Sequence, residues 1–315
     1  QQVGRQFRFE NILGDSPLIG EAINLAKKVA PTDATVLLLG ETGTGKEVFA
    51  QAIHNASKRR NHSFMALNCS AFTKELLESE IFGHKAGAFT GAAKDKRGLI
   101  EEANSGTLFL DEIGEMPVEL QSKLLRVLET NEFIKVGDTK STRVNVRFIA
   151  ATNRDLQDDV NKGKFREDLF YRLNVFSITL PALRERKKDI PILTKYFVEF
   201  FANRLNKKIQ TIHTDFLDHL QNHNWKGNIR ELKNIIERAC ILENSDQLTV
   251  SSLPLELQTL NFKPQTLSAF DLASIEKLHI QRVLNHTKGN KTEAAKLLNI
   301  GLTTLYRKIE EYNIQ

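Results

Sequence analysis

The 315-residue sequence contains only two cysteines, Cys69 and Cys240, which lie far apart along the chain. Two distant thiols do not make the disulfide framework of a small secreted domain, and we expect both to be buried apolar residues without a redox role. No uninterrupted apolar run approaches the ~20 residues that span a bilayer, and no signal peptide is visible. These absences predict a cytoplasmic protein without a membrane-spanning segment.

A strong excess of one charge is also missing. Lysine and arginine number 44 against 39 aspartates and glutamates, a formal net charge of +5. This balance is compatible with a nucleic-acid partner but does not identify one, because many basic proteins merely carry a solvated surface. The length and the apolar fraction of 41% are sufficient for about two or three domains with a sizeable core.

Short apolar runs alternate with helical patterns over the first 180 residues. Strands that alternate with helices predict an α/β fold with a largely parallel sheet that is covered on both faces. After Pro181 the strand signals stop, and apolar residues follow helical spacing, which predicts an all-α lid. The runs expected to form strands are 36–39, 64–67, 107–110, 146–150 and 175–180.

The chain is expected to divide into three folded parts and a linker. The last lid helix should begin at Asn228, with Glu231 completing a capping box, and end near Leu242. Residues 256–268 are polar and show no periodicity, as is typical of a linker. The predicted parts are an α/β core at 1–181, the lid at 182–255, the linker at 256–269 and a C-terminal helical domain at 270–315.

A glycine-rich segment directly follows the first predicted strand and precedes a helical pattern. Its spacing, Gly-x-x-x-x-Gly-Lys, fits a P-loop, in which backbone N–H groups and the lysine bind phosphates at a helix N-terminus. The order of strand, loop and helix favours this interpretation over an ordinary glycine-rich turn. Glu47 stands where serine or threonine usually offers a hydroxyl to Mg²⁺, so the metal must depend on other groups. The expected nucleotide-binding residues are Gly40, Glu41, Thr42, Gly43, Thr44, Gly45, Lys46 and Glu47.

An acidic pair, Asp111 and Glu112, ends the third predicted strand. Such a pair alone is usually a solvated turn, but downstream of a P-loop and directly after an apolar strand it becomes specific. Asp111 would hold Mg²⁺, and Glu112 would orient or deprotonate the attacking water. The predicted chemistry is phosphoryl transfer from ATP to water.

The segment between these motifs reads Gly-Ala-Phe-Thr-Gly-Ala. It is similar to the GAFTGA loop of bacterial enhancer-binding proteins, the AAA+ activators of sigma-54 RNA polymerase. Glycines on either side let a loop protrude, so Phe89 at its tip is expected to be a contact group rather than a core residue. The intact match argues against an ordinary glycine-rich turn. The resemblance implies that polymerase is contacted by Gly87, Ala88, Phe89, Thr90, Gly91 and Ala92.

The resemblance covers nearly the whole chain and implies further roles. Asn68 matches the position that holds the catalytic glutamate at rest, and Asn153 matches sensor I, which faces the γ-phosphate. Arg166 and Arg172 match arginine fingers that reach the neighbouring subunit's nucleotide. Arg230 matches sensor II, which touches the phosphates from the lid.

Some positions keep a competing interpretation or depart from the family. The arginine fingers could instead form a surface ion pair with Glu167 or Asp168. Ile12 resembles the apolar wall of the adenine site but also suits an ordinary core. Lys226 stands where the family usually has proline, whereas a glutamate is usual at the position of Glu47.

The C-terminal residues have the rhythm of a helix-turn-helix and resemble the Fis-type DNA-binding domain. Asn290 and Glu293 are expected to cap a first helix, Asn299 to take a left-handed turn, and a second helix to run over about 302–312. An earlier helix at 272–284 would pair with its twin in a dimer. A plain packing hairpin is the competing interpretation. The residues expected to face DNA are Thr303, Thr304, Tyr306, Arg307 and Lys308.

The resemblance implies an activator in a two-component system that binds upstream DNA. ATP hydrolysis in a hexameric or heptameric ring would remodel sigma-54 RNA polymerase for open-complex formation. Because the chain begins at Gln1, we expect a regulatory domain to precede it. Two other classes of protein compete with this interpretation. Another AAA+ machine would need no GAFTGA loop or DNA-binding tail, and a repressor with a merely regulatory nucleotide site would have lost Glu112 or the arginines.

Overall fold

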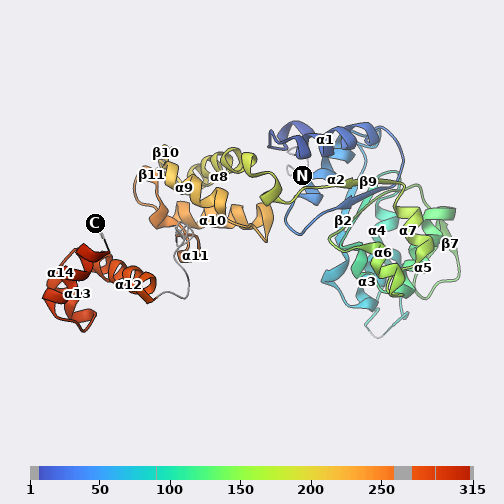
Figure 1. The fold of residues 1–315 in the computed structure, drawn as a ribbon. Helices are drawn as coiled ribbons and strands as arrows, with labels where there is room; N and C mark the ends of the chain where they lie inside the picture. The colour runs from blue at the N-terminus through green and yellow to red at the C-terminus, as the bar shows by residue number, and fades with distance from the viewer. Residues whose placement is uncertain (1–6, 90, 259–271, 288, 313–315) are drawn as a thin grey trace. The chain divides into compact units, whose positions relative to one another are not determined.

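The computed structural model describes residues 7–89, 91–258, 272–287 and 289–312 (Figure 1). Two compact units, Gln1–Gln258 and Thr259–Gln315, are described separately. The larger unit holds the predicted α/β core and lid, and the smaller one holds the C-terminal helices. Within the described residues, no helix is both long and apolar enough to cross a membrane.

The α/β core is built on a five-stranded sheet whose hydrogen-bonded neighbours all run parallel, in the order β2-β5-β8-β1-β9. Parallel strands require crossover connections, which the intervening helices provide. The prediction of a parallel sheet with helices is confirmed, and each predicted apolar run overlaps one strand. The strands are β1 Val36–Leu39, β2 Phe64–Asn68, β5 Thr107–Asp111, β8 Arg147–Thr152 and β9 Phe176–Thr179.

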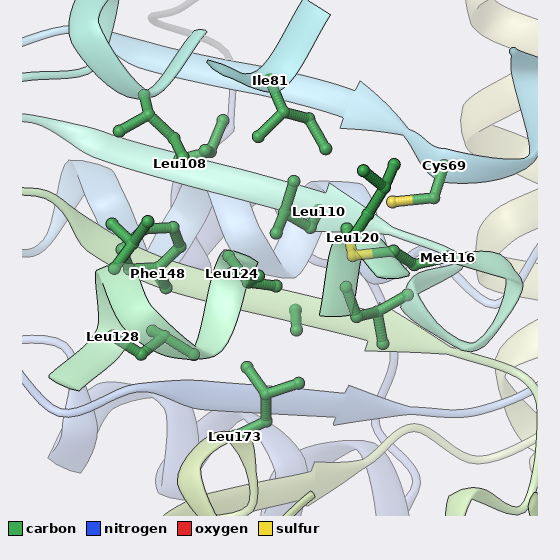
Figure 2. Packing of buried hydrophobic residues seen from close by; sticks show 14 of the residues in the cluster. Cys69, Ile81, Leu108, Leu110, Met116, Leu120, Leu124, Leu128, Phe148 and Leu173 are labelled. Carbon is green, nitrogen blue, oxygen red and sulfur yellow. The ribbon is translucent and has the colours of Figure 1, made fainter. Parts of the chain in front are cut away.

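Helices cover both faces of the sheet. Alternate residues of β5 point to opposite faces, so Leu108 and Leu110 belong to one apolar cluster and Phe109 to the other. Figure 2 shows the first cluster, the one that includes Leu108 and Leu110. In it, Leu120 and Leu124 of α5 lie near the strands of the sheet. The helices are α1 Pro17–Val29 and α2 Lys46–Asn55 on one face, and α3 Lys74–Phe82, α5 Val118–Thr130, α6 Leu156–Asn161 and α7 Glu167–Leu173 on the other.

Two short hairpins and one short helix complete the core. The strands β3 and β4 form an antiparallel pair, as do β6 and β7. The isolated bridge between His84 and Val136 connects the two hairpins. Their bounds are β3 Gly83–His84, β4 Lys96–Arg97, α4 Leu99–Glu102, β6 Glu132–Ile134 and β7 Ser141–Arg143.

The lid is mainly helical, with an apolar cluster of its own. The indole of Trp225 is fully buried in it and donates from Nε1 to the Leu220 carbonyl at 2.7 Å. The lid is not wholly α-helical, because β10 and β11 pair in parallel. Its elements are α8 Ile190–Leu205, β10 Thr211–Ile212, α9 Thr214–Asn222, α10 Asn228–Leu242, β11 Gln247–Leu248 and α11 Leu255–Gln258.

The capping box predicted at Asn228 is wrong. Helix α10 does begin at Asn228, but its N-cap is Gly227, whose N–H donates to Glu231 Oε2 at 2.7 Å. Asn228 itself has φ +52°. Its side chain leaves the helix for the P-loop, as described below, and so cannot cap α10.

The C-terminal unit consists of α12 Leu272–His286, α13 Lys291–Leu297 and α14 Leu302–Glu311 around a small apolar cluster that includes Ala294 and Leu305. Asn290 caps α13, since its side chain accepts from the Glu293 N–H at 3.3 Å. Asn299 has φ +52°, as predicted for the turn. The three expected helices and the helix-turn-helix are confirmed.

Both cysteines are buried and free, as expected. Burial raises the pKa of the Cys69 thiol to about 12, and the nearby Asp111 carboxylate adds to the effect. A thiol with so high a pKa is not nucleophilic at neutral pH.

His54 is a buried titratable group in the core. It lies on α2, is 3% exposed, and places Nδ1 2.9 Å from Thr107 Oγ1 of β5. Burial lowers its pKa from 6.5 to about 4, because the charged imidazolium would lose its hydration there. Between pH 6.5 and about 4, the imidazole of His54 therefore stays neutral in the folded protein but is protonated in the unfolded chain.

We expect the free energy of unfolding to fall by about 3 kcal/mol from this residue as the pH is lowered from about 6.5 to about 4, since one pKa unit is worth about 1.4 kcal/mol. Unfolded His54 takes up a proton in that window and folded His54 does not, so the contribution is complete above the window. In urea titrations, His54→Asn should show a flatter pH dependence. His213→Asn, at the exposed N-cap of α9, is the control. An unchanged slope in His54→Asn would contradict this assignment.

Candidate nucleotide-binding and catalytic site

The P-loop connects β1 to α2, and its conformation requires glycine. Gly43 has φ +82°, and a Cβ there would lie 2.3 Å from the Gly227 carbonyl of the lid. Gly45, with φ +103°, is the N-cap of α2 and has no side chain to bond the free N–H groups of the first turn. These N–H groups and the helix dipole make the start of α2 an anion site.

Lys46 places its charge inside this loop. It is 6% exposed, and its Nζ donates to the carbonyls of Gly40 at 2.8 Å and Glu41 at 3.3 Å. Its Nζ also lies 3.8 Å from Glu112 Oε1. The lysine therefore lies between the loop and the acidic pair. Glu47, the next residue, is exposed on the first turn of α2.

The acidic pair lies where β5 ends. Glu112 has φ +51°, a left-handed conformation that costs a residue with a side chain roughly 1–2 kcal/mol. This turn directs its carboxylate towards Lys46 and to within 3.4 Å of the Asn153 N–H. Asp111 Oδ1 accepts from the Glu112 N–H at 3.0 Å. Strain held in place by such contacts is typical of catalytic groups.

The two predicted asparagines reach this edge of the sheet by different contacts. Asn153 follows β8 and donates from Nδ2 to Thr42 Oγ1 at 3.1 Å. Asn68 is the register partner of Asp111. Its Oδ1 accepts from the N–H and hydroxyl of Ser70, at 2.8 and 2.7 Å, while Glu112 is held by Lys46 and Asn153. The restraint of Glu112 by Asn68 stays a prediction.

The donor set suits Mg²⁺ bound mainly through a nucleotide. Among the described residues, no group of three or more His, Cys, Asp or Glu side chains could hold a metal ion alone. Mg²⁺ usually keeps waters and binds through one or two carboxylates plus substrate phosphates. Asp111, at the end of β5, fits that pattern without a hydroxyl at position 47.

A cavity of about 420 Å³ opens at this edge of the sheet, lined by Gly40, Thr152 and Asn153 among others. Ligands of parallel α/β sheets bind beyond the carboxyl ends of the strands, as here. A larger groove of about 1480 Å³ surrounds His54 and Asn55 at the far end of α2, and no predicted site residue lines it. The smaller cavity, unlike the groove, is therefore lined by predicted site residues, Gly40 and Asn153.

The lid closes directly on the P-loop. The Ile229 N–H donates to the Gly43 carbonyl at 3.0 Å, and Arg230 Cβ would lie 3.2 Å from a Cβ at Gly43. Arg230 is exposed, and its contact with phosphates stays a prediction. Ile12 is half-buried and packs on the core cluster around α1 and α2; its contact with an adenine ring stays a prediction.

Sequence reasoning missed two residues that bond to the P-loop. Asn228 Nδ2 donates to Glu41 Oε2 at 3.1 Å and to the Thr42 carbonyl at 3.0 Å. Arg184 pairs with the same Glu41 carboxylate through two bonds, of 2.8 and 2.5 Å. The bonds to Arg184 and Asn228 lower the pKa of Glu41 to about 2. The one available signal was the place of Asn228, two residues before Arg230.

The GAFTGA segment forms a closed turn between β3 and β4. The Gly87 N–H donates to the Ala92 carbonyl at 2.8 Å, and both Gly87 and Gly91 have positive φ with open space around them. Phe89 is half-buried rather than fully exposed, because its ring meets that of His84 edge-on at 4.9 Å between centroids. Ala88 packs beside Gly137, and Ala92 is 6% exposed. Thr90 lies outside the described residues.

The base of this loop is fixed by an ion pair. Lys85 Nζ lies 2.7 Å from Asp95 Oδ2, and Asp95 Oδ1 accepts from the Ala86 N–H at 2.8 Å. The loop is therefore anchored at its base.

Within one chain, the two candidate arginine fingers bond to their own surroundings. Arg166 pairs with Asp168 at 2.7 Å, the partner that the competing interpretation named. Arg172 Nη2 donates to the Leu128 carbonyl near the end of α5 at 3.0 Å. Neither is hydrogen-bonded or ion-paired to a described P-loop residue of the same chain. Their action on a neighbour stays a prediction.

The candidate DNA-facing residues lie on α14. Thr303, Tyr306 and Arg307 are exposed, whereas Thr304 and Lys308 are half-buried. Lys308 Nζ lies 2.6 Å from Glu276 Oε2 of α12, so part of its charge is neutralised within the unit. Contact of these residues with DNA stays a prediction.

Three family models match the chain. Residues 12–179 match the sigma-54 interaction domain, residues 184–269 the AAA+ ATPase lid domain, and residues 271–312 the bacterial regulatory protein, Fis family.

Relatives of known name and solved structure agree with these matches. The alginate biosynthesis transcriptional regulatory protein AlgB of Pseudomonas syringae pv. tomato is 46% identical over 95% of this chain. The transcriptional regulatory protein ZraR of Salmonella typhimurium is 44% identical over 95%. This chain spans 66% and 68% of their lengths. The crystal structure of NtrX from Brucella abortus in complex with ATP matches with a TM-score of 0.72 and 34% identity, over 96% of this chain and 69% of that one.

Glu112→Gln should retain ATP binding but lower the hydrolysis rate about 10²–10⁴-fold, because the amide cannot accept a proton from water. Binding of a fluorescent ATP analogue and phosphate release measure the two effects. Glu115→Gln is the matched control, since Glu115 pairs with Arg154 at 3.2 Å. Near wild-type turnover in Glu112→Gln would remove Glu112 from the catalytic role.

Proposed function

This chain belongs to the NtrC-like family of sigma-54-dependent bacterial transcriptional regulators, and from that premise we propose that it is an ATP-driven activator of transcription. It acts in the cytoplasm, binds upstream DNA as a dimer through residues 270–315, and assembles into a ring. ATP hydrolysis in the ring remodels sigma-54 RNA polymerase for open-complex formation. The observation that carries the proposal is the presence of a P-loop, an acidic pair and an anchored GAFTGA loop in one domain.

The proposed chemistry is hydrolysis of ATP. The P-loop N–H groups and Lys46 bind the phosphates, and Arg230 approaches from the lid. Asp111 would hold Mg²⁺, which would neutralise part of the phosphate charge. Glu112 accepts a proton from the attacking water, and Asn153, bonded to Thr42, senses whether the γ-phosphate is present.

The proposed output is movement of the GAFTGA loop. A loop anchored at its base by Lys85 and Asp95 can move as one piece. A conformational change at the nucleotide would then move the base of the loop, and the loop would carry that movement to the polymerase. Phe89 then exchanges its contact with His84 for an apolar contact with the partner. Gly87, Ala88, Thr90, Gly91 and Ala92 form the rest of that surface.

Phe89→Ala should retain at least half of the ATPase rate and abolish open-complex formation, because the phenyl ring of Phe89 contacts polymerase and not nucleotide. The measurements are phosphate release and promoter melting by sigma-54 holoenzyme. Phe72→Ala removes a phenylalanine that is 39% exposed outside the loop and should melt the promoter normally. Loss of ATP binding in Phe89→Ala would instead place this loop in the nucleotide site.

With the arginine fingers, each active site is built from residues of two subunits. Arg166 and Arg172 bond within their own chain in ways that are easily exchanged, an exposed ion pair and a carbonyl contact. Release towards a neighbour would supply positive charge to the transition state.

Arg172→Ala should assemble and bind ATP but hydrolyse it ~10³–10⁵-fold more slowly. Mixed with Glu112→Gln subunits, some interfaces regain an intact Glu112 beside an intact Arg172, so hydrolysis should partly return. Arg204→Ala, on the exposed surface of the lid, is the control. A co-assembled mixture no more active than the sum of its parts would show that Arg172 acts in cis or only structurally.

A further inference from the structure

We infer that Glu41, Arg184 and Asn228, here called the lid–loop cluster, position the P-loop and the lid as one unit. The inference rests on the proposed function, since it assigns positioning residues to the proposed ATP site. Each member belongs to a different segment: the P-loop, the entry to the lid and the first turn of α10.

Asn228 is the centre of the cluster. Its side chain is fully buried and uses both ends of its amide. Nδ2 donates to Glu41 Oε2 and to the Thr42 carbonyl, at 3.1 and 3.0 Å, and Oδ1 accepts from the Leu183 N–H at 2.8 Å. The cost of its left-handed φ of +52° is smallest for asparagine and aspartate among residues with side chains. The backbone is thus held in an uncommon conformation that directs this amide at the loop.

Glu41 gives the cluster its charge. Its carboxylate receives two bonds from the Arg184 guanidinium in a fork arrangement and one from Asn228. Charge-assisted forked pairs of this kind fix orientation as well as distance. Arg184 lies just after the core's last strand, β9, so the pair connects the P-loop to the point where the lid begins.

Backbone contacts complete the connection. Ile229 donates its N–H to the Gly43 carbonyl at 3.0 Å, and Gly43 leaves no room for a Cβ against Gly227. Residues 41, 42 and 43 are therefore each bonded to the lid segment. The backbone of Arg230, the next residue along α10, is therefore held beside the loop.

Thr42 extends this coupling to the catalytic side. Its hydroxyl accepts from Asn153 Nδ2, and its carbonyl accepts from Asn228 Nδ2. Asn153 of the core and Asn228 of the lid thus bond to the same residue, so a movement of Asn153 can reach the lid through Thr42. The lid–loop cluster therefore transmits the state of the site to lid orientation.

Asn228→Asp tests the cluster with little change in shape. The new carboxylate cannot donate to Glu41 or Thr42 and repels Glu41, while it tolerates the same φ. We expect the exchange rate of the Ile229 amide in the nucleotide-free protein to rise about tenfold or more, and the Kd for a non-hydrolysable Mg–ATP analogue to rise similarly. Glu237→Gln, which removes a different lid carboxylate paired with Arg204 at 4.0 Å, should change neither.

The folded state of the lid is checked separately. Fluorescence of Trp225, the only tryptophan of the chain, reports whether the lid is folded. If Asn228→Asp unfolds it, Arg184→Gln, on a side chain 37% exposed, should raise Ile229 exchange in a folded lid.

Unchanged Ile229 exchange in the folded variants would overturn the inference. A wild-type protein that binds no nucleotide would instead refute the proposed function. The exchange comparison without nucleotide would still decide the role of the cluster.

Discussion

A phosphate-binding loop must leave its N–H groups free for the ligand, so its carbonyls have to be satisfied elsewhere. In this protein four consecutive carbonyls turn away from the anion site and find donors from the loop itself and from the lid. The rest of the site depends on these carbonyl bonds, because they orient the N–H groups of the loop towards the ligand and connect the loop to the lid. The donors are Lys46 Nζ to Gly40, Thr44 Oγ1 to Glu41, Asn228 Nδ2 to Thr42 and Ile229 N to Gly43, at 2.8 to 3.0 Å.

The parallel sheet brings the remaining groups to the same place. Its strands all end at one edge, so the P-loop after β1, the acidic pair at the end of β5 and Asn153 after β8 meet there although they are far apart in sequence. The left-handed turn at Glu112 is the local strain that this convergence supports. Lys46 Nζ lies 3.8 Å from Glu112 Oε1, so the lysine keeps this carboxylate beside the loop.

Local patterns predicted most of this architecture. The apolar runs predicted the strands, and the spacing of Gly40, Gly45 and Lys46 predicted the loop, because each signal spans only a few residues. The bonds from Asn228 to Glu41 and Thr42 join residues 187 and 186 positions apart, and a capping pattern at Asn228 predicted a different use of the same side chain. Phe89 was expected at an exposed tip, but its contact with His84 comes from the hairpin geometry rather than from the motif. The partners of Arg172 across an interface depend on a second chain.

We propose that hydrolysis of ATP at the P-loop to which the lid is bonded drives promoter opening. The most direct measurement is open-complex formation by sigma-54 holoenzyme at a promoter with an upstream site, with Mg–ATP or with a non-hydrolysable analogue. The account predicts open complexes with ATP alone, although both nucleotides bind. Equal promoter opening with the analogue, or none with ATP in a protein that hydrolyses it, would contradict the account.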